Sequence, residues 1–340
     1  MLNRLLTLAT NRISALPVLV LMPHSRCNCR CVMCDIWKAN HNKQEINSDT
    51  LALHIDSFRK LGVKHVAFSG GEALMHDNLW KLCEQLKTIG VKITLLSTGI
   101  TLKNHAKEVV HWCDEVTVSL DGSHDVHNQI RNLPRAYEKL QEGIAAIKII
   151  KTNFRITART VIQKLNYRDF PHILEAAKSL AVDQISFLPA DLSSTAFNRE
   201  NPWTQDKVVE VGLDKNETDE LQDIIEKSFL DYAELYEQRF VAESKKKMLD
   251  IVQYYRASLG LIDFPAKKCN APWVSAVIET DGEVKPCFFL PAYGNIYKHS
   301  FSEIVNSQQA IAYRKNLNMR ENATCQKCVC SLHLGLRQML

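Results

Sequence analysis

Short β-branched runs alternate with longer amphipathic stretches over the first half of the chain. The runs predict strands, and the stretches, which have apolar residues at helical spacing, predict helices. The predicted strands cover residues 17–22, 65–68, 92–97, 115–120, 155–162 and 184–188, and the predicted helices cover residues 48–60, 77–89, 102–112, 134–150 and 168–179. Ser48 is the expected N-cap of the first helix, and Gly62 is expected to end it. Six strands interleaved with helices favour an α/β fold, a partial (β/α)6 TIM-like barrel.

The pattern changes after Pro189. Residues 191–207 are polar and predict a loop, whereas residues 217–259 predict two helices. Further along, segments 273–278 and 283–287 flank Asp281 and Gly282, which is typical of a β-hairpin. We therefore expect four parts: an N-terminal extension (1–16), the barrel core (17–190), a helical insertion (191–262) and a small C-terminal domain of a hairpin and helices (263–340).

Composition and charge limit the class of protein. The chain has 340 residues, of which 46% are hydrophobic and 24% charged, enough for one barrel-sized core and an appendage. The formal net charge of +4 is mild and the basic residues are spread along the chain, so we expect no nucleic-acid partner. No apolar run reaches the roughly 18 to 20 residues of a transmembrane helix. Arg4 and Arg12 interrupt any signal-peptide core, so we expect neither export nor a membrane partner.

The eleven cysteines indicate the compartment. Seven of them fall into two groups with metal-like spacing, and a chain of this length does not need disulfides to fold. We therefore expect a protein of the reducing cytoplasm.

The first cysteine group has the spacing Cys-x3-Cys-x2-Cys and comprises Cys27, Cys31 and Cys34. Three thiolates on a four-iron cube leave one iron open to a substrate or cofactor, whereas structural clusters are usually closed by four cysteines. Zinc is the alternative, and Cys29 or His24 would then supply the fourth ligand. Because Cys29 lies inside the x3 gap, we expect its side chain to point away from a cube.

Polar residues follow the ends of predicted strands, where parallel α/β folds place their active sites. Gly70, Gly71 and Glu72 follow the second strand, and the two glycines allow the backbone to approach a ligand closely. The corresponding residues at the next two strands are Ser97, Thr98, Ser119 and Asp121. The alternative for Gly70, Gly71 and Glu72 is a simple strand-to-helix turn with a solvated Glu72. For the residues at the next two strands it is a turn whose side chains bond their own backbone.

The second cysteine group comprises Cys269, Cys287, Cys325 and Cys328, two distant single cysteines and a Cys-x2-Cys clip. Four thiolates can close one [4Fe-4S] cluster, and zinc could bind the same set. Cys330 is a spare or alternative ligand.

Together these motifs resemble the radical S-adenosylmethionine (radical SAM) superfamily. The C-terminal cysteines and Gly282 are similar to the shortened SPASM module that is called a twitch domain. The resemblance spans residues 27 to 330 and implies two [4Fe-4S] clusters, one that binds SAM through its open iron and one auxiliary. It also implies that SAM is cleaved reductively to a 5'-deoxyadenosyl radical. Glu72 matches the family element that binds the SAM amino group, and Ser119 matches a residue near the SAM ribose or carboxylate.

The resemblance assigns further candidates. Met33 stands where relatives usually carry an aromatic residue against the adenine. Asp121 is expected to orient the ribose or the substrate. Arg159 would fit the SAM carboxylate if it faces into the barrel, and it would contact an outer helix if it does not. His127 and Arg131 are similar to a His-x3-Arg segment of SPASM-type enzymes and are candidate substrate residues, with a solvated surface helix as the alternative.

A fully ligated auxiliary cluster would accept an electron from a substrate radical, which predicts an oxidation. We expect a dehydrogenase-type oxidoreductase that takes hydrogen from a polar small molecule such as a sugar or cyclitol, with flavodoxin or ferredoxin as electron donor. The alternatives are a maturase of ribosomal peptides, a redox-neutral sugar dehydratase or epimerase, and a zinc-binding interaction protein without catalysis. Substrate contacts are expected beyond the sixth strand, at Asp191, Ser193, Asn198, Arg199 and Trp203, and a polar surface loop is the alternative. The sequence singles out no catalytic acid or base.

Overall fold

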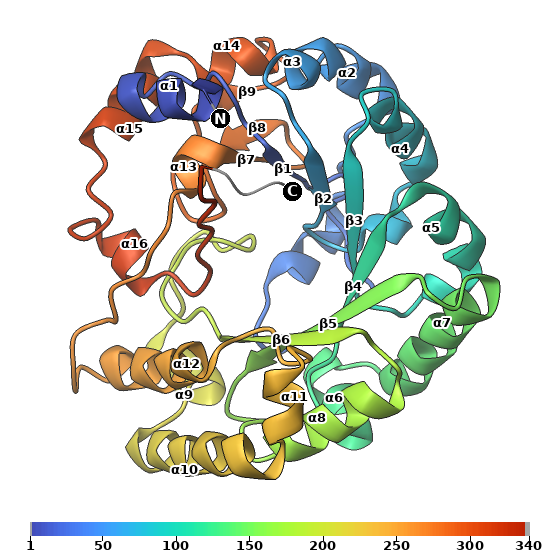
Figure 1. Ribbon diagram of the computed structural model, residues 1–340, viewed down its shortest axis with the longest axis vertical. Helices are drawn as coiled ribbons and strands as arrows, with labels where there is room; N and C mark the ends of the chain where they lie inside the picture. Colours follow the sequence, from blue (N-terminus) through green and yellow to red (C-terminus); the bar gives the residue numbers. More distant parts are fainter. Residues whose placement is uncertain (1, 337–340) are drawn as a thin grey trace.

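The computed structural model describes residues 2–336, and in it six consecutive strands form the wall of an open barrel (Figure 1). Strands β1 to β6 lie in chain order, and every neighbouring pair is parallel. Their bounds are Val18–Leu21 (β1), His65–Phe68 (β2), Lys92–Ser97 (β3), Glu115–Ser119 (β4), Arg155–Ile162 (β5) and Gln184–Pro189 (β6). A doubly wound sheet would instead reverse its strand order at a switch point. The expected α/β fold with a partial barrel is therefore confirmed.

Helices cover the outer face of this sheet (Figure 1). The α-helices of the barrel are α2 Ser48–Ala52, α3 Ile55–Lys60, α4 Leu79–Lys87, α5 Ala106–Trp112, α6 His124–Arg131, α7 Ala136–Ile150 and α8 Phe170–Ser179. Single turns of 3-10 helix cover Ile36–His41 (η1), Ala73–Met75 (η2) and Leu102–His105 (η3). The helix expected over residues 48–60 is interrupted between α2 and α3, where buried His54 bonds the carbonyl of Ile296 at 3.0 Å. Its N-cap is Asn47, whose side chain accepts from Thr50 N at 2.8 Å, so the prediction of Ser48 was wrong by one residue.

The C-terminal strands continue the barrel sheet. β7 (Ser275–Ile278) pairs in parallel with β1, and the antiparallel strands β8 (Glu283–Lys285) and β9 (Gly294–Asn295) extend the sheet to nine strands. The expected hairpin turn is present, with Gly282 at φ +84°, a conformation that favours glycine. Trp273, expected on a strand, lies in the short helix α13 (Ala271–Val274), because a proline in the first turn favours helix. Helices α14 Phe301–Val305, α15 Gln308–Asn316 and α16 Ala323–Lys327 follow.

The insertion after β6 is more helical than the sequence indicates. Its helices are α9 Gln205–Val211, α10 Lys215–Asp231, α11 Ala233–Glu237 and α12 Lys245–Ser258, so residues 217–259 hold three helices instead of two. Tyr255 of α12 donates to Ile162 O at 2.5 Å and accepts from Ala190 N at 3.0 Å. These bonds fix the insertion against the carboxyl ends of β5 and β6. At the other end of the chain, helix α1 (Leu2–Thr10) packs near α13.

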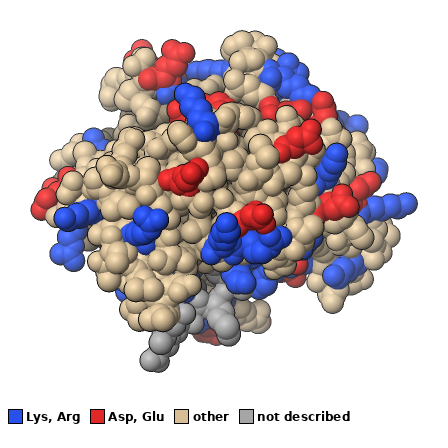
Figure 2. All heavy atoms as spheres, turned by 90° about the horizontal axis from the view of Figure 1, so that it is seen from above, with Lys and Arg blue, Asp and Glu red and all other residues tan. Residues whose placement is uncertain are grey.

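Basic and acidic side chains are interspersed on the face that Figure 2 shows. The mild positive charge of the chain is therefore not gathered into one basic area on that face. Within residues 2–336, none of the helices combines the length and the apolar character needed to cross a membrane.

Candidate active site

The cysteine loop follows β1 and opens into a cavity of about 240 Å³ at the carboxyl ends of the strands. Cys27, Cys31 and Cys34 all line this cavity. Cys29 is buried, is absent from the lining and interacts with the Cys31 thiol, as its position in the gap predicts. His24, the other candidate for a fourth zinc ligand, instead bonds Glu45 at 2.8 Å. The loop therefore presents three thiols to one space.

Backbone contacts hold this loop in place. The Asn40 side chain accepts from Cys27 N and donates to Cys27 O, both at 2.9 Å. Glu72 N donates to Arg26 O at 2.9 Å, and a Cβ on Gly71 would come within 2.1 Å of the same oxygen. Only glycine therefore permits the contact between the loop after β2 and the cysteine loop.

Glu72 lies behind the cavity wall instead of in it. It is fully buried, and its carboxylate accepts from Thr98 N at 2.7 Å, from Thr98 Oγ1 at 2.6 Å and from Ser97 Oγ at 3.1 Å. Burial raises the pKa of Glu72, while the bonds from Thr98 act in the opposite direction. Gly70, Gly71, Ser97 and Thr98 do line the cavity. In this geometry Glu72 orients the end of β3, and its expected contact with an amino group stays a prediction.

Asp121 and Arg131 form an ion pair beside the cysteine loop. Asp121 is fully buried and is absent from the cavity lining, whereas the Arg131 side chain, 7% exposed, lines the cavity and donates to Cys31 Sγ at 3.4 Å. His127 is also buried and outside the lining, and its Nδ1 accepts from Asp121 N at 3.2 Å. In this structure Asp121 and His127 contact other protein groups, and their expected contacts with the ribose or the substrate stay predictions.

The remaining candidates from the barrel face the cavity. Ser119, Arg159 and Met33 line it, and Arg159 Nε donates to Ser186 Oγ at 3.2 Å. On β5 the residues on either side of Arg159 are buried against the helices. Arg159 thus takes the inward orientation that the sequence left open.

The loop after β6 lines part of the cavity and also contacts the residue after the cysteine loop. Asp191 lines the cavity and pairs with Arg199 at 2.9 Å. Arg199 is stacked 3.7 Å from the Trp203 ring centroid, and Trp203 Nε1 donates to Asp35 at 2.5 Å. Ser193, Asn198, Arg199 and Trp203 are outside the lining, so four of the five expected substrate contacts have mainly structural partners here.

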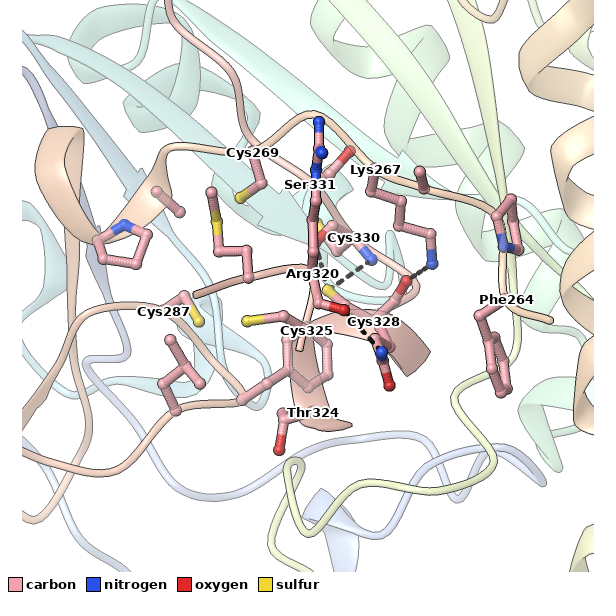
Figure 3. A pocket seen from close by; sticks show the side chains of 18 residues that line it. Phe264, Lys267, Cys269, Cys287, Arg320, Thr324, Cys325, Cys328, Cys330 and Ser331 are labelled. Atoms are coloured by element: carbon pink, nitrogen blue, oxygen red, sulfur yellow. Dashed lines mark hydrogen bonds between the residues drawn. The ribbon is translucent and has the colours of Figure 1, made fainter. Parts of the chain in front are cut away.

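The second cysteine group lines a separate pocket of about 210 Å³ in the C-terminal part. Figure 3 shows the side chains of five cysteines around it: Cys269, Cys287, Cys325, Cys328 and Cys330. Cys269 precedes α13 and Cys287 follows β8, whereas the other three lie in or just after α16. Lys267 donates to the carbonyl of Cys328. The pocket thus holds one thiol more than a closed cluster needs.

Val329 separates the two sites. It lines the barrel cavity, while its neighbours Cys328 and Cys330 line the C-terminal pocket. A second contact is aromatic: Phe197 lines the barrel cavity and lies 5.9 Å, ring to ring, from Phe289, which lines the C-terminal pocket. Apolar side chains, namely Val329 and the Phe197–Phe289 pair, therefore lie between the cavity and the C-terminal pocket.

Comparison with known proteins agrees with this arrangement. A family model described as the radical SAM superfamily matches residues 21–177, and one described as SPASM, an iron-sulfur cluster-binding domain, matches residues 269–329. The chain thus carries a radical SAM domain and a SPASM domain. Each match includes one of the two groups of thiols, so the resemblance seen in the sequence is confirmed.

Relatives in this superfamily have different activities. The chain is 26% identical over 289 residues to a GTP 3',8-cyclase of Staphylococcus epidermidis, covering 79% of this chain and 77% of the relative. It is 23% identical to the subtilosin biosynthesis protein AlbA of Bacillus subtilis, over 83% of this chain and 58% of AlbA. The crystal structure of Streptococcus suis SuiB bound to S-adenosylmethionine has the same fold, with a TM-score of 0.59, 14% identity and coverage of 96% of this chain and 75% of SuiB.

The donors fit the cofactors of a radical SAM enzyme with a SPASM domain, namely SAM and two [4Fe-4S] clusters. Three thiols beside an open cavity suit a cluster with a free iron, and the five C-terminal thiols suffice for a closed auxiliary cluster. Burial raises the pKa of Cys34 and of Cys287 to about 12, whereas Cys29 and Arg131 lower the pKa of Cys31. Since metal ligands must be deprotonated, cluster assembly would release protons at the buried thiols.

Sequence reasoning missed three residues that organise the site. These residues are Asp35, Phe197 and Val329. Their residue types are common in loops and do not indicate a place at the site. Position could have identified two of them, because Asp35 follows the third cysteine of the first group and Val329 lies between two cysteines of the second.

Proposed function

We propose that this radical SAM enzyme oxidises an unactivated C–H bond of a polar substrate and passes one electron to its auxiliary cluster. The observation that carries the proposal is the position of Val329, whose two neighbours present thiols to the auxiliary pocket while Val329 itself faces the barrel cavity. A substrate in the cavity would be separated from the auxiliary cluster by little more than this side chain.

The chemistry balances as a two-electron oxidation. When bound, SAM and the N-terminal cluster would supply a 5'-deoxyadenosyl radical that takes one hydrogen atom from the substrate. A base would then accept a proton from the substrate, and the auxiliary cluster held by the C-terminal thiols would accept an electron. Flavodoxin or ferredoxin would supply the reducing electron for SAM cleavage.

The protein residues that we assign to this reaction face the cavity. The guanidinium of Arg159 suits the SAM carboxylate, and Gly70, Gly71, Ser97, Thr98 and Ser119 surround the same space. Asp191 is the sole carboxylate lining this cavity within residues 2–336, so we assign it the role of proton acceptor. Its pairing with Arg199 keeps it in place beside the substrate.

The substrate class is the finer part of the proposal. We keep a polar small molecule, such as a sugar or cyclitol, as the first candidate because of the charged groups Asp191 and Arg159 on the cavity wall. A ribosomal peptide is the second candidate. AlbA is a bacteriocin biosynthesis protein and SuiB has been solved with its precursor peptide SuiA, and both are similar to this chain.

An anaerobic assay of the reconstituted protein tests the function. We expect about eight irons per chain, as two four-iron clusters require, and formation of 5'-deoxyadenosine from SAM with dithionite. The correct substrate should increase this formation and yield a product lighter by two hydrogen atoms. A product of unchanged mass would support redox-neutral chemistry instead, and stable zinc without SAM cleavage would contradict an enzyme.

The electron-acceptor role needs its own variant. Cys287→Ala, made together with Cys330→Ala so that the spare thiol cannot replace it, should lose the auxiliary cluster and the oxidised product but keep SAM cleavage. Cys113→Ser is the matched control, because Cys113 packs beside Cys83 and lines neither site. Full product formation by the double variant without its auxiliary cluster would contradict the role.

A further inference from the structure

Arg131 lines the same cavity as the ligand sulfurs of the N-terminal cluster site. Its Nη1 donates to Cys31 Sγ at 3.4 Å, within the range for a hydrogen bond to sulfur. The side chain is 7% exposed, so it is largely removed from bulk water. A buried cation thus bonds one of the three thiols that hold the cluster.

The charge of Arg131 is balanced by one carboxylate. Arg131 Nη2 pairs with Asp121, which is fully buried and held by Val161 N at 2.8 Å. The two opposite charges make the pair neutral as a unit, and the pair orients one N–H toward the sulfur. If one partner is lost, the remaining buried charge acts strongly on its surroundings, because the dielectric constant is low there.

The backbone fixes the position of Arg131. The carbonyls of Ile130 and Arg131, at the end of α6, accept from Val32 N and Arg30 N, both at 3.1 Å. Cys31 lies between these two donors. The end of α6 and the cysteine loop therefore form one rigid unit.

We propose that the Asp121–Arg131 pair sets the reduction potential of the N-terminal cluster through the bond from Arg131 to Cys31. Donors to the sulfurs and local positive charge stabilise the reduced, more negative cluster, and so raise its potential. This role does not depend on which substrate the protein acts on. It concerns the cluster at the SAM-binding site, which the radical SAM domain already implies. In this proposal Asp121 and Arg131 act on the cluster, whereas the sequence predicted contacts with the ribose or the substrate for them.

The proposal predicts the direction in which each variant shifts the reduction potential of the cluster. Arg131→Gln removes the cation and leaves the Asp121 carboxylate buried beside the cluster, so the potential should fall. Asp121→Asn leaves Arg131 without its counter-charge and keeps its bond to Cys31, so the potential should rise. A merely structural role would disturb the site in the same way in both variants and would give shifts of the same sign.

The test is an anaerobic redox titration of the reconstituted full-length protein, followed by electron paramagnetic resonance. The signal that changes on addition of SAM identifies the N-terminal cluster, because only its open iron binds SAM. At a fixed potential near the wild-type midpoint, we expect the ratio of reduced to oxidised cluster to fall about tenfold in Arg131→Gln and to rise about tenfold in Asp121→Asn, equivalent to about 59 mV each for one electron.

Opposite shifts of this kind support the proposal. Shifts of the same sign, or shifts below twofold in both variants, overturn it. If Arg131→Gln fails to assemble its cluster, Arg131→Lys and Asp121→Asn decide the matter: a ratio within about threefold of wild type in the lysine variant and a rise in Asp121→Asn support the proposal. An unchanged or lower ratio in Asp121→Asn then overturns it.

Discussion

Arg199 pairs with Asp191 at 2.9 Å, and its Nε lies 3.5 Å from a second carboxylate, that of Asp35. Asp191 lines the cavity beyond β6, and Asp35 directly follows Cys34. One buried guanidinium thus connects the loop at the barrel mouth to the cysteine loop, and Trp203 covers its face at 3.7 Å.

Replacing Arg199 should destabilise the protein strongly. Arg199→Met leaves the buried Asp191 carboxylate without its cation, whereas Asp35 keeps its pair with Lys38 at 2.7 Å. We expect the free energy of unfolding to fall by roughly 3 kcal/mol. Arg256→Met is the control, because Arg256 and Asp219 form a partly exposed pair for which a change below about 1 kcal/mol is expected. Denaturant unfolding of all three proteins measures the difference. Equal losses in the two variants would show that Arg199 has no special role.

Gly71→Ala should disrupt the cysteine loop. The new Cβ would meet Arg26 O at 2.1 Å, so one of the two loops must move. We expect reconstitution to give roughly half the iron of the wild-type protein, because one of two four-iron clusters is lost. Gly90→Ala forces alanine to a positive φ but has open space around it, so it should cost about 1 kcal/mol without loss of iron. Full iron in Gly71→Ala would contradict the contact.

Asp191→Asn should separate product formation from SAM cleavage. The amide keeps the shape of the carboxylate but cannot accept a proton, so turnover of the substrate should fall by roughly 10² to 10⁴. Formation of 5'-deoxyadenosine should persist, since it precedes proton loss. The control is Ser194→Ala, which removes a hydroxyl donor to the same carboxylate and should alter turnover only a few-fold. Mass spectrometry of both products measures the two steps, and unchanged turnover in Asp191→Asn would exclude the assigned role.

His127 should make the protein sensitive to acid. Burial, and then the nearby Arg131, hold the pKa of His127 well below its ordinary value of about 6.5. Below pH 6.5 the unfolded chain therefore binds a proton that the folded chain does not, and stability falls as pH falls.

His127→Gln should remove this contribution. We expect the variant to lose roughly 1 kcal/mol less stability than the wild-type protein between pH 8 and pH 6. Denaturant unfolding at both pH values measures the loss. His172→Gln is the control, because it makes the same substitution at an exposed histidine. An equal acid loss in wild type and His127→Gln would mean that folding leaves the pKa of His127 unchanged, which would contradict the prediction.

The sequence alone determined the barrel and the identity of the thiols. Strand and helix periodicity are local properties, so the six parallel strands followed from the pattern. The same holds for Cys27, Cys31 and Cys34, because three ligands within eight residues need only one loop to converge. The helix break at His54 was missed because its cause is a contact with Ile296, far along the chain.

Tertiary structure alone decided what the polar candidates contact. Glu72, Asp121 and Arg199 have side chains that suit a ligand, but each is buried against partners from other elements, and burial favours an internal bond over an unpaired charge. Conversely, nothing in the type of Val329 marks it, and only the folded chain shows that it lines the barrel cavity while its neighbours line the C-terminal pocket. Local pattern thus determined which elements form and which atoms can bind metal. Long-range packing determined which polar groups face the cavity, because pairing across the sheet depends on contacts that no short window of sequence contains.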